Sequence, residues 1–228
     1  LYMVLSPSFV DKFKEFTGTA NSGHLHVLTN PVTIDSSSYH YSFSQKKKEI
    51  IYMGRIDNNQ KRVYRVIDTW AKLEEKFPDW KLTIVGDGVE RKNIEKQVVA
   101  YGLKRVKFEG FQQPMPYYER ASILLLTSEY EGFPLVLAEC MSFGVIPAVY
   151  NSYSAVRDII DNAKDGIVIP YHKDGYKAKE AADLLAAIMK DEDKREQMAL
   201  AAIEKSKEYS VEKIYGEWEK VFNSLLAK

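Results

Sequence analysis

Two glutamates, Glu131 and Glu139, flank a stretch whose residue types suit the binding of a polar ligand. Seven residues separate them, and the intervening segment begins with Gly132-Phe133-Pro134. A carboxylate repels a phosphate group, but it accepts hydrogen bonds from neutral hydroxyls, and its two oxygens suit a vicinal diol. The pair therefore predicts contacts to hydroxyl groups. On spacing alone, a loop charge and a solvated helix residue explain the two glutamates equally well.

The residues around this pair predict a strand, a tight turn and a helix. The apolar run 123–126 is too short for a helix and is typical of a buried strand. Pro134 stands where a first helical residue is expected, and Gly144 offers the helix a left-handed stop. Because the first N–H groups of a helix have no partner within it, this arrangement predicts an anion site. The amides expected to face that site are those of Gly132, Phe133 and Leu135.

The two glutamates, with Gly-Phe-Pro after the first, resemble the E-x7-E signature of the retaining GT-B glycosyltransferases of family 4. Enzymes of that family transfer a sugar from a nucleotide diphosphate sugar. The resemblance implies that Glu139 holds the ribose hydroxyls of the donor and that Glu131 contacts the transferred sugar. It runs from about Leu1 to the end of the chain.

A second motif of the resemblance follows the apolar segment 49–53. It is a Gly54-Arg55 turn with a lysine, Lys61, six residues beyond the arginine. It is not a Walker loop, because the second glycine and the Lys-Ser/Thr pair are absent. The resemblance implies that Arg55 binds the donor diphosphate through its planar fork and that Lys61 binds it as a point charge. An ordinary surface loop with basic residues is the alternative.

Two further turns border the nucleotide pocket in the resembled family. Gly86 and Gly88 form a Gly-x-Gly turn, which lacks the third glycine of a dinucleotide fingerprint and so counts against an NAD module. Phe111 follows the next strand candidate; it can pack on a base or fill the core, and we favour the core. The histidines lack metal-ligand spacing. We expect no cofactor and no metal, with charge neutralisation by Arg55, Lys61 and the helix dipole.

The chain as a whole predicts an α/β fold. Apolar strand candidates alternate with amphipathic helical stretches from residue 48 onward, as in the segment from Val63 to Phe77, which keeps helical spacing. We therefore expect a Rossmann-like parallel sheet with helices on both faces, one half of a GT-B fold, and a ligand at the carboxyl ends of its strands. The strand candidates are 49–53, 81–85, 106–108, 123–126, 146–150 and 167–169.

Three regions are expected along the chain. Residues 1–45 resemble the end of an N-terminal acceptor domain and its linker, which contains a serine-rich segment. Residues 46–190 form the nucleotide-sugar-binding domain, and residues 191–228 form C-terminal helices. These helices pack either on the same domain or back toward the N-terminal domain. The side of the last helix expected to be buried carries Trp218, Phe222 and Leu225.

Composition restricts the partners and the compartment. The 228 residues include 32 Lys and Arg and 32 Asp and Glu, so no overall field favours nucleic acid or an acidic membrane. The single cysteine, Cys140, favours a reducing compartment, and its apolar surroundings favour core packing over a nucleophilic role. No signal peptide and no bilayer-spanning apolar run is present. We expect a cytoplasmic protein whose membrane association, through the missing domain, is open.

The function implied by the resemblance is transfer of a hexose from a UDP- or GDP-sugar, with retention, in polysaccharide biosynthesis. The acceptor is expected to be a glycan or a lipid-linked sugar held by the missing N-terminal acceptor domain. This chain alone is therefore expected to bind the donor but to transfer no sugar. Two alternatives stay open. One is a GT-B epimerase or phosphorylase, and the other is a plain nucleotide-binding Rossmann module without chemistry.

Overall fold

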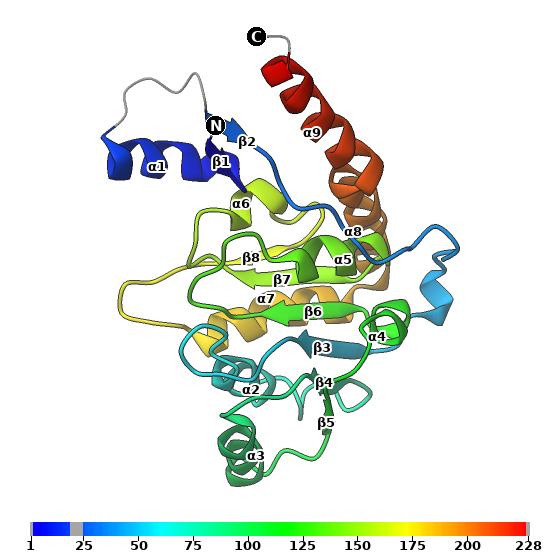
Figure 1. Cartoon of the computed structure of the whole chain (residues 1–228). Helices are drawn as coiled ribbons and strands as arrows, with labels where there is room; N and C mark the ends of the chain where they lie inside the picture. The colour runs from blue at the N-terminus through cyan, green and yellow to red at the C-terminus, as the bar shows by residue number, and fades with distance from the viewer. Residues whose placement is uncertain (1, 19–24, 227–228) are drawn as a thin grey trace.

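Six parallel strands form the central sheet, in the spatial order β5-β4-β3-β6-β7-β8 (Figure 1). The structure, a computed structural model, describes residues 2–18 and 25–226. The chain adds β4 and β5 on one side of β3 and then crosses to add β6, β7 and β8 on the other. Such a switch point is where open parallel sheets bind ligands, at the carboxyl ends of the strands. The strands are β3 (Glu49–Met53), β4 (Lys81–Val85), β5 (Val106–Gly110), β6 (Ile123–Leu126), β7 (Ile146–Tyr150) and β8 (Ile167–Ile169).

The strand predictions are confirmed, and only β5 differs, because it runs two residues further to Gly110. Every residue of β6 and of β7 is buried. A parallel strand covered on both faces has no solvent-facing side, which is why its sequence is a continuous apolar run without alternation.

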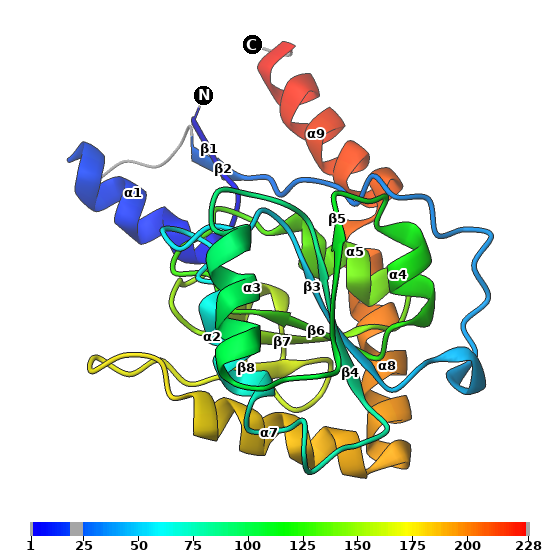
Figure 2. The same cartoon turned by 90° about the horizontal axis from the view of Figure 1, so that it is seen from below.

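Helices cover both faces of this sheet, as the sequence predicted. Figure 2 shows α2 and α3 on one side and α4, α5 and α8 on the other. α7 packs against α2, and α8 packs against α5. The helices are α2 (Tyr64–Trp70), α3 (Arg91–Ala100), α4 (Met115–Arg120), α5 (Leu135–Ser142), α6 (Val156–Ile159), α7 (Ala178–Lys190) and α8 (Glu192–Ser206).

α2 is shorter than its apolar spacing predicts. It ends at Trp70, and the buried Leu73 and Phe77 follow in turns. These turns keep i→i+3 and i→i+4 hydrogen bonds, since the N–H of Leu73 donates to the carbonyl of Trp70 and that of Phe77 to the carbonyl of Leu73. The spacing of apolar residues therefore identified the buried side of the segment but not where the regular helix stops.

The first described residues form a small separate sheet that is tied to the main domain. The hydroxyl of Ser6 and the N–H of Ser8 (3.0 Å) both donate to the carboxylate of Asp158, in α6. The assignment of residues 1–45 to another domain stays a prediction, and Leu1 and His24 lie outside the described residues. The elements here are β1 (Tyr2–Val4), η1 (Pro7–Phe9), α1 (Val10–Thr17), β2 (Leu25–Val27) and η2 (Phe43–Gln45).

The last helix, α9 (Val211–Leu226), extends away from the sheet (Figure 1). After η3 (Lys207–Tyr209), Ser210 is extended and turns the chain outward. Of the described α9 residues only Ile214 is buried, while Phe222 and Leu225 are 50% and 39% exposed. Phe222 and Leu225 are therefore not covered by the sheet domain in this structure. Packing of the helix against another domain stays a prediction.

One buried carboxylate, Asp165, makes the stability of the domain depend on pH. Its side chain is 1% exposed; Oδ1 accepts the N–H of Asp161 at 2.8 Å, and Oδ2 has no partner among the described residues. Burial raises the pKa of Asp165 to about 6, whereas an unfolded aspartate has a value of 3.8. The neutral form is thus favoured in the folded state, and its stabilisation is lost as the pH rises from about 4 through about 6.

We expect Asp165→Asn to remove this loss, because an amide stays neutral at every pH. Urea unfolding at pH 4 and pH 7 should show that the variant retains about 2 kcal/mol more of its stability on going to the higher pH than the wild type does. Asp193→Asn is the matched control, since Asp193 is exposed and is not among the groups that shift the pKa of Asp165. The same pH dependence in Asp165→Asn and in the wild type would refute the assignment.

Candidate functional site

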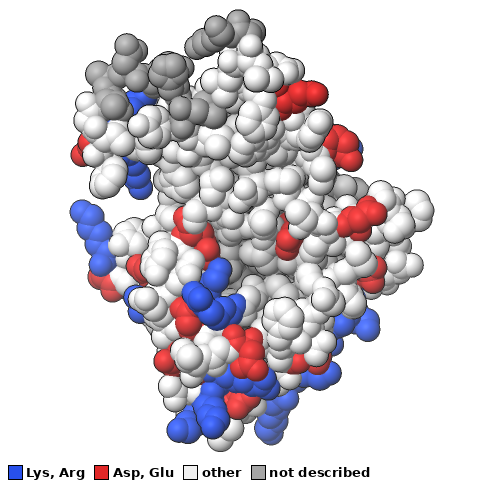
Figure 3. Space-filling model, viewed as in Figure 1, with Lys and Arg blue, Asp and Glu red and all other residues white. Residues whose placement is uncertain are grey.

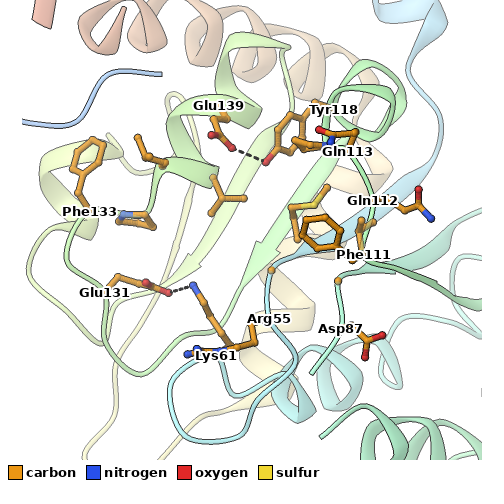
Figure 4. A pocket seen from close by; sticks show the side chains of 18 residues that line it. Arg55, Lys61, Asp87, Phe111, Gln112, Gln113, Tyr118, Glu131, Phe133 and Glu139 are labelled. Atoms are coloured by element: carbon orange, nitrogen blue, oxygen red, sulfur yellow. Dashed lines mark hydrogen bonds and ion pairs between the residues drawn. The ribbon is translucent and has the colours of Figure 1, made fainter. Parts of the chain in front are cut away.

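A cavity of about 680 Å³ opens at the carboxyl ends of β3, β4 and β6 (Figure 4). It collects most of the residues that the sequence predicted for the site. Two described residues of that prediction, Gly88 and Gly132, do not line it. The predicted residues that do line it are Gly54, Arg55, Lys61, Gly86, Phe111, Glu131, Phe133, Pro134, Leu135 and Glu139. Asp87, Gln112 and Gln113 also line it, from the two turns that the resemblance placed beside the pocket, although they were not singled out; Tyr118 was not predicted at all.

The cavity loop that follows β3 is held by a carboxylate that sequence reasoning also missed. Oδ1 of Asp57 accepts three backbone N–H groups, from Asn59, Gln60 and Lys61, at 3.1, 2.7 and 3.1 Å. Its Oδ2 accepts Nε of Arg55 at 2.8 Å. Burial alone would raise the pKa of Asp57, but these hydrogen bonds outweigh it and lower the pKa. Asp57 therefore fixes the backbone from which both cations project.

Lys61 forms an ion pair with Glu131 inside the cavity. Its Nζ lies 2.6 Å from Oε1, and the two side chains are 16% and 8% exposed (Figure 4). Oε2 of the same carboxylate accepts Nε2 of Gln60 at 3.0 Å. The sequence predicted both residues for the site but did not predict this contact, because they are 70 positions apart and belong to different loops.

Arg55 lies at the edge of the cavity. Its side chain is 65% exposed, and beside its bond to Asp57 its Nη2 donates to Oε1 of Gln60 at 3.1 Å. The hydrogen bond to Asp57 raises the pKa of the guanidinium. On this face of the molecule, basic and acidic side chains are intermingled (Figure 3). Attraction of an anion therefore depends on the local pair Arg55 and Lys61, not on a field of one sign.

Gly86 and Gly88 allow the second loop to lie directly against the first. A Cβ at Gly86 would stand 1.8 Å from the carbonyl oxygen of Gly54, and one at Gly88 would stand 2.3 Å from that of Ile56. Two hydrogen bonds join the loops: the N–H of Gly54 donates to Val85 at 3.0 Å, and that of Ile56 donates to Asp87 at 2.8 Å. Both glycines thus shape the cavity through backbone contact.

The turn before α5 leaves backbone donors at the cavity. Pro134 is the N-cap of α5, one position earlier than predicted. Across the described residues, no acceptor pairs with the N–H of the cavity residues Phe133, Leu135 and Val136, or with that of Gly132 beside them. At the other end of α5, the N–H groups of Gly144 and Val145 donate to Met141 and Cys140, with Gly144 at φ +69°, as predicted for a left-handed stop. The helix thus presents free donors where an anion would be stabilised.

Glu139 lies on the opposite side of the cavity from Glu131 (Figure 4). Its Oε2 accepts the hydroxyl of Tyr118, on α4, at 3.1 Å. Burial raises the pKa of Glu139, and the bond from Tyr118 partly offsets this. Tyr118 is itself held from behind, because Nζ of Lys46 donates to its carbonyl at 2.7 Å. A fixed carboxylate whose second oxygen has no hydrogen-bond partner among the described residues suits a ligand hydroxyl.

Phe111 is 83% exposed at the rim of the cavity, so our preference for core packing was wrong. β5 ends at Gly110, whose φ of +70° turns the chain outward before Phe111. An exposed ring beside a polar cavity can stack on a planar ligand group.

Other sequence predictions concern residues outside the cavity. Cys140 is fully buried and its thiol donates to the carbonyl of Leu137, which confirms core packing. In the part of the chain that the structure describes, His, Cys, Asp and Glu side chains form no group of three able to hold a metal ion. No described helix is long and apolar enough to cross a membrane.

The cavity thus combines two cations and several unpaired N–H groups on one side with a half-buried carboxylate and an exposed ring on the other. The first set suits a phosphate or diphosphate. The second suits hydroxyls and a planar group. A ligand that carries all of these parts is a nucleoside diphosphate.

Known proteins resemble this chain in sequence and in fold. Residues 36–205 match the family model described as glycosyl transferases group 1. An α-1,4-N-acetyl-D-galactosaminyltransferase of Campylobacter jejuni, whose name gives an undecaprenol-linked acceptor, is 30% identical over 198 residues, which are 86% of this chain and 53% of that protein. The chain spans about half the length of the curated relatives it matches.

Two solved structures have the same fold. HepE of Anabaena, in complex with UDP and glucose, superposes with a TM-score of 0.82 at 20% identity, over 98% of this chain and 63% of that one. The C-terminal domain of LpcC, a glycosyl transferase group 1 protein of Francisella tularensis, has a TM-score of 0.67 at 23% identity, over 78% of this chain and 99% of that one. Since the family model covers most of its length, the chain belongs to the glycosyl transferases group 1 family, and it shares the fold of the LpcC C-terminal domain.

Proposed function

We propose that this chain is the donor-binding domain of a retaining glycosyltransferase of family 4 that uses a UDP- or GDP-sugar. The observation that carries the proposal is the cavity, which Lys61 and the unpaired N–H groups at the start of α5 share with a half-buried carboxylate, Glu139. The complex of HepE with UDP and glucose supports a nucleotide sugar as the ligand.

In this proposal, different groups of the cavity bind different parts of the donor. Arg55, Lys61 and the N-terminus of α5 neutralise the diphosphate, which is the leaving group of the transfer. Stabilising charge as it develops in the transition state contributes more to the rate of many enzymes than any other effect, and fixed donors do this without reorganisation. Because these groups supply the positive charge, we propose that the donor binds without a divalent cation. Glu139 accepts the ribose hydroxyls, and Glu131 contacts the transferred sugar.

The acceptor is proposed to be a glycan or a lipid-linked sugar bound by a second domain, in line with the undecaprenol-linked acceptor in the name of the Campylobacter relative. Transfer requires an acceptor oriented against the donor sugar, and that orientation is a large part of the rate. We therefore propose that residues 1–228 alone bind the donor and transfer no sugar to any acceptor.

A thermal-shift screen tests the donor class. UDP, GDP, UDP-glucose, UDP-N-acetylglucosamine and GDP-mannose are compared with NAD and ATP, each with and without EDTA. We expect a raised Tm with either the uridine or the guanosine series, unchanged by EDTA. Stabilisation only by NAD or ATP, or only in the presence of a divalent cation, would contradict the proposal.

If Glu139 accepts the ribose hydroxyls, replacing it should weaken the affinity for the nucleotide without its sugar. Glu139→Gln keeps the shape but weakens the acceptor, so calorimetry should show UDP or GDP binding weakened by about 1–2 kcal/mol. The same variant should bind the 2′,3′-dideoxy nucleotide as well as the wild type does. An equal loss for both ligands would mean that Glu139 acts on the fold and not on the ribose.

A further inference from the structure

The ion pair between Lys61 and Glu131 places two proposed ligand contacts against each other. Nζ and Oε1 are 2.6 Å apart, and both side chains are largely withdrawn from water, at 16% and 8% exposure. Lys61 is the better shielded of the two cavity cations, since Arg55 is 65% exposed. The cation proposed for the diphosphate is thus paired with a carboxylate of the chain itself.

A carboxylate and a phosphate oxygen make the same kind of contact to an ammonium group. Taking Lys61 away from Glu131 therefore costs a shielded ion pair, which an incoming diphosphate must replace. The diphosphate also meets the negative charge of Glu131 at short range, which disfavours its binding. Both effects have the same sign: for a nucleotide that carries no sugar, Glu131 opposes binding.

We propose that Glu131 is an internal competitor of the donor diphosphate for Lys61. Before the donor binds, its carboxylate holds Lys61 in the cavity; the diphosphate then draws Lys61 away, and the freed Oε1 accepts hydroxyls of the donor sugar. The inference rests on the proposed function and adds a regulation to it, because the site resists a bare nucleotide and accepts one that carries a sugar.

Gln60 keeps the freed carboxylate in place. Its Nε2 donates to Oε2 of Glu131 at 3.0 Å and to the carbonyl of Tyr130 at 3.2 Å, and its Oε1 accepts from Arg55. These bonds do not involve Lys61, so they persist when Lys61 moves to the diphosphate. The backbone of Gln60 is also joined to the same loop, since its carbonyl accepts the N–H of Glu129 at 2.7 Å. The carboxylate is therefore held at the cavity wall and does not turn out to solvent.

Calorimetry on the whole chain, with UDP and GDP as probes, tests the competitor. We expect Glu131→Gln to tighten binding of the bare nucleotide by roughly three- to tenfold, since it removes a competing contact and a like charge. The gain in affinity from adding the sugar, measured with UDP-glucose, UDP-N-acetylglucosamine and GDP-mannose, should fall in the same variant. Glu129→Gln is the matched control: it removes one charge from the same loop, but Glu129 pairs with Arg65 and Arg62. It should leave both affinities unchanged.

A measurement on the wild type does not depend on how the variant folds. With ¹³C-labelled glutamate, the side-chain carboxyl signal of Glu131 should move when UDP or GDP is added, while that of Glu129 stays. If the wild type binds the nucleotide and Glu131→Gln binds it equally well or more weakly, Glu131 does not compete for Lys61. An unmoved Glu131 signal at saturation would also overturn the proposal. Failure of the wild type to bind either nucleotide would instead reject the proposed function.

Discussion

Replacing Lys61 by alanine is expected to weaken UDP or GDP binding by about 2–3 kcal/mol, or roughly 30- to 150-fold. The variant removes a shielded charge from the cavity, where its side chain is only 16% exposed. It also leaves Glu131 without its cation, so the incoming diphosphate meets an uncompensated negative charge. Both consequences act against the nucleotide, which is why we expect this to be the largest loss at the site.

The comparison with Arg55→Ala shows whether the loss comes from direct contact between Lys61 and the diphosphate or from removal of any positive charge near the cavity. Arg55 is 65% exposed and bonded to Asp57, so its removal should cost less than about 1.5 kcal/mol. Adding Glu131→Gln to Lys61→Ala should restore part of the lost affinity, because it removes the charge left behind. Equal losses in the two single variants, or no loss in Lys61→Ala, would show that Lys61 does not contact the diphosphate. Isothermal titration calorimetry gives these values.

Gly86→Ala is expected to destabilise the domain by more than about 3 kcal/mol. The new Cβ would stand 1.8 Å from the carbonyl oxygen of Gly54. The backbone there also has a φ of +137°, which residues other than glycine rarely adopt. The loops after β3 and β4 would have to separate, and the cavity wall would separate with them. Urea unfolding measures the loss.

Gly102→Ala is the matched control for this prediction. Gly102 also has a positive φ, of +66°, but a Cβ there meets nothing within 4 Å. Its substitution should cost only backbone strain, about 1 kcal/mol. If the two variants lose the same stability, the contact between the loops is not what requires glycine at position 86.

The fold was predictable because its sheet is parallel and covered on both sides. Buried strands such as β6 and β7 leave a continuous apolar run in the sequence, and the runs between helical stretches gave their bounds. Periodicity could not show whether the apolar side of an amphipathic helix is covered by another part of the protein. The apolar side of α9 is typical of a buried face, yet Phe222 is half exposed in this chain, because periodicity records that a side is apolar and not what covers it.

The site was predictable where a motif names residues one at a time. Glu131, Glu139 and Lys61 all line the cavity, and the spacing along the chain located them. The contacts among them were not predictable, because they join residues far apart in sequence. The bond from Tyr118 to Glu139 spans 21 positions, and that from Lys61 to Glu131 spans 70. No local pattern records such a distance.

Asp57 is a case where a signal was present but unused. An aspartate two residues after the Gly-Arg turn is a residue type that accepts backbone N–H groups of the following turn. Phe111 shows the opposite: an aromatic residue after a strand favours the core on average, and only the positive φ of Gly110 places it at the rim.

The central claim is that a nucleoside diphosphate lies between Lys61 and the N-terminus of α5. An amide NMR titration of the ¹⁵N-labelled chain with UDP and GDP tests it most directly, because it locates the ligand residue by residue. We predict that the N–H signals of Gly132, Phe133, Leu135 and Val136, together with those of the loop 54–61, shift most, with EDTA present throughout. Binding whose largest shifts fall outside the cavity, or no binding of either nucleotide, would contradict the account.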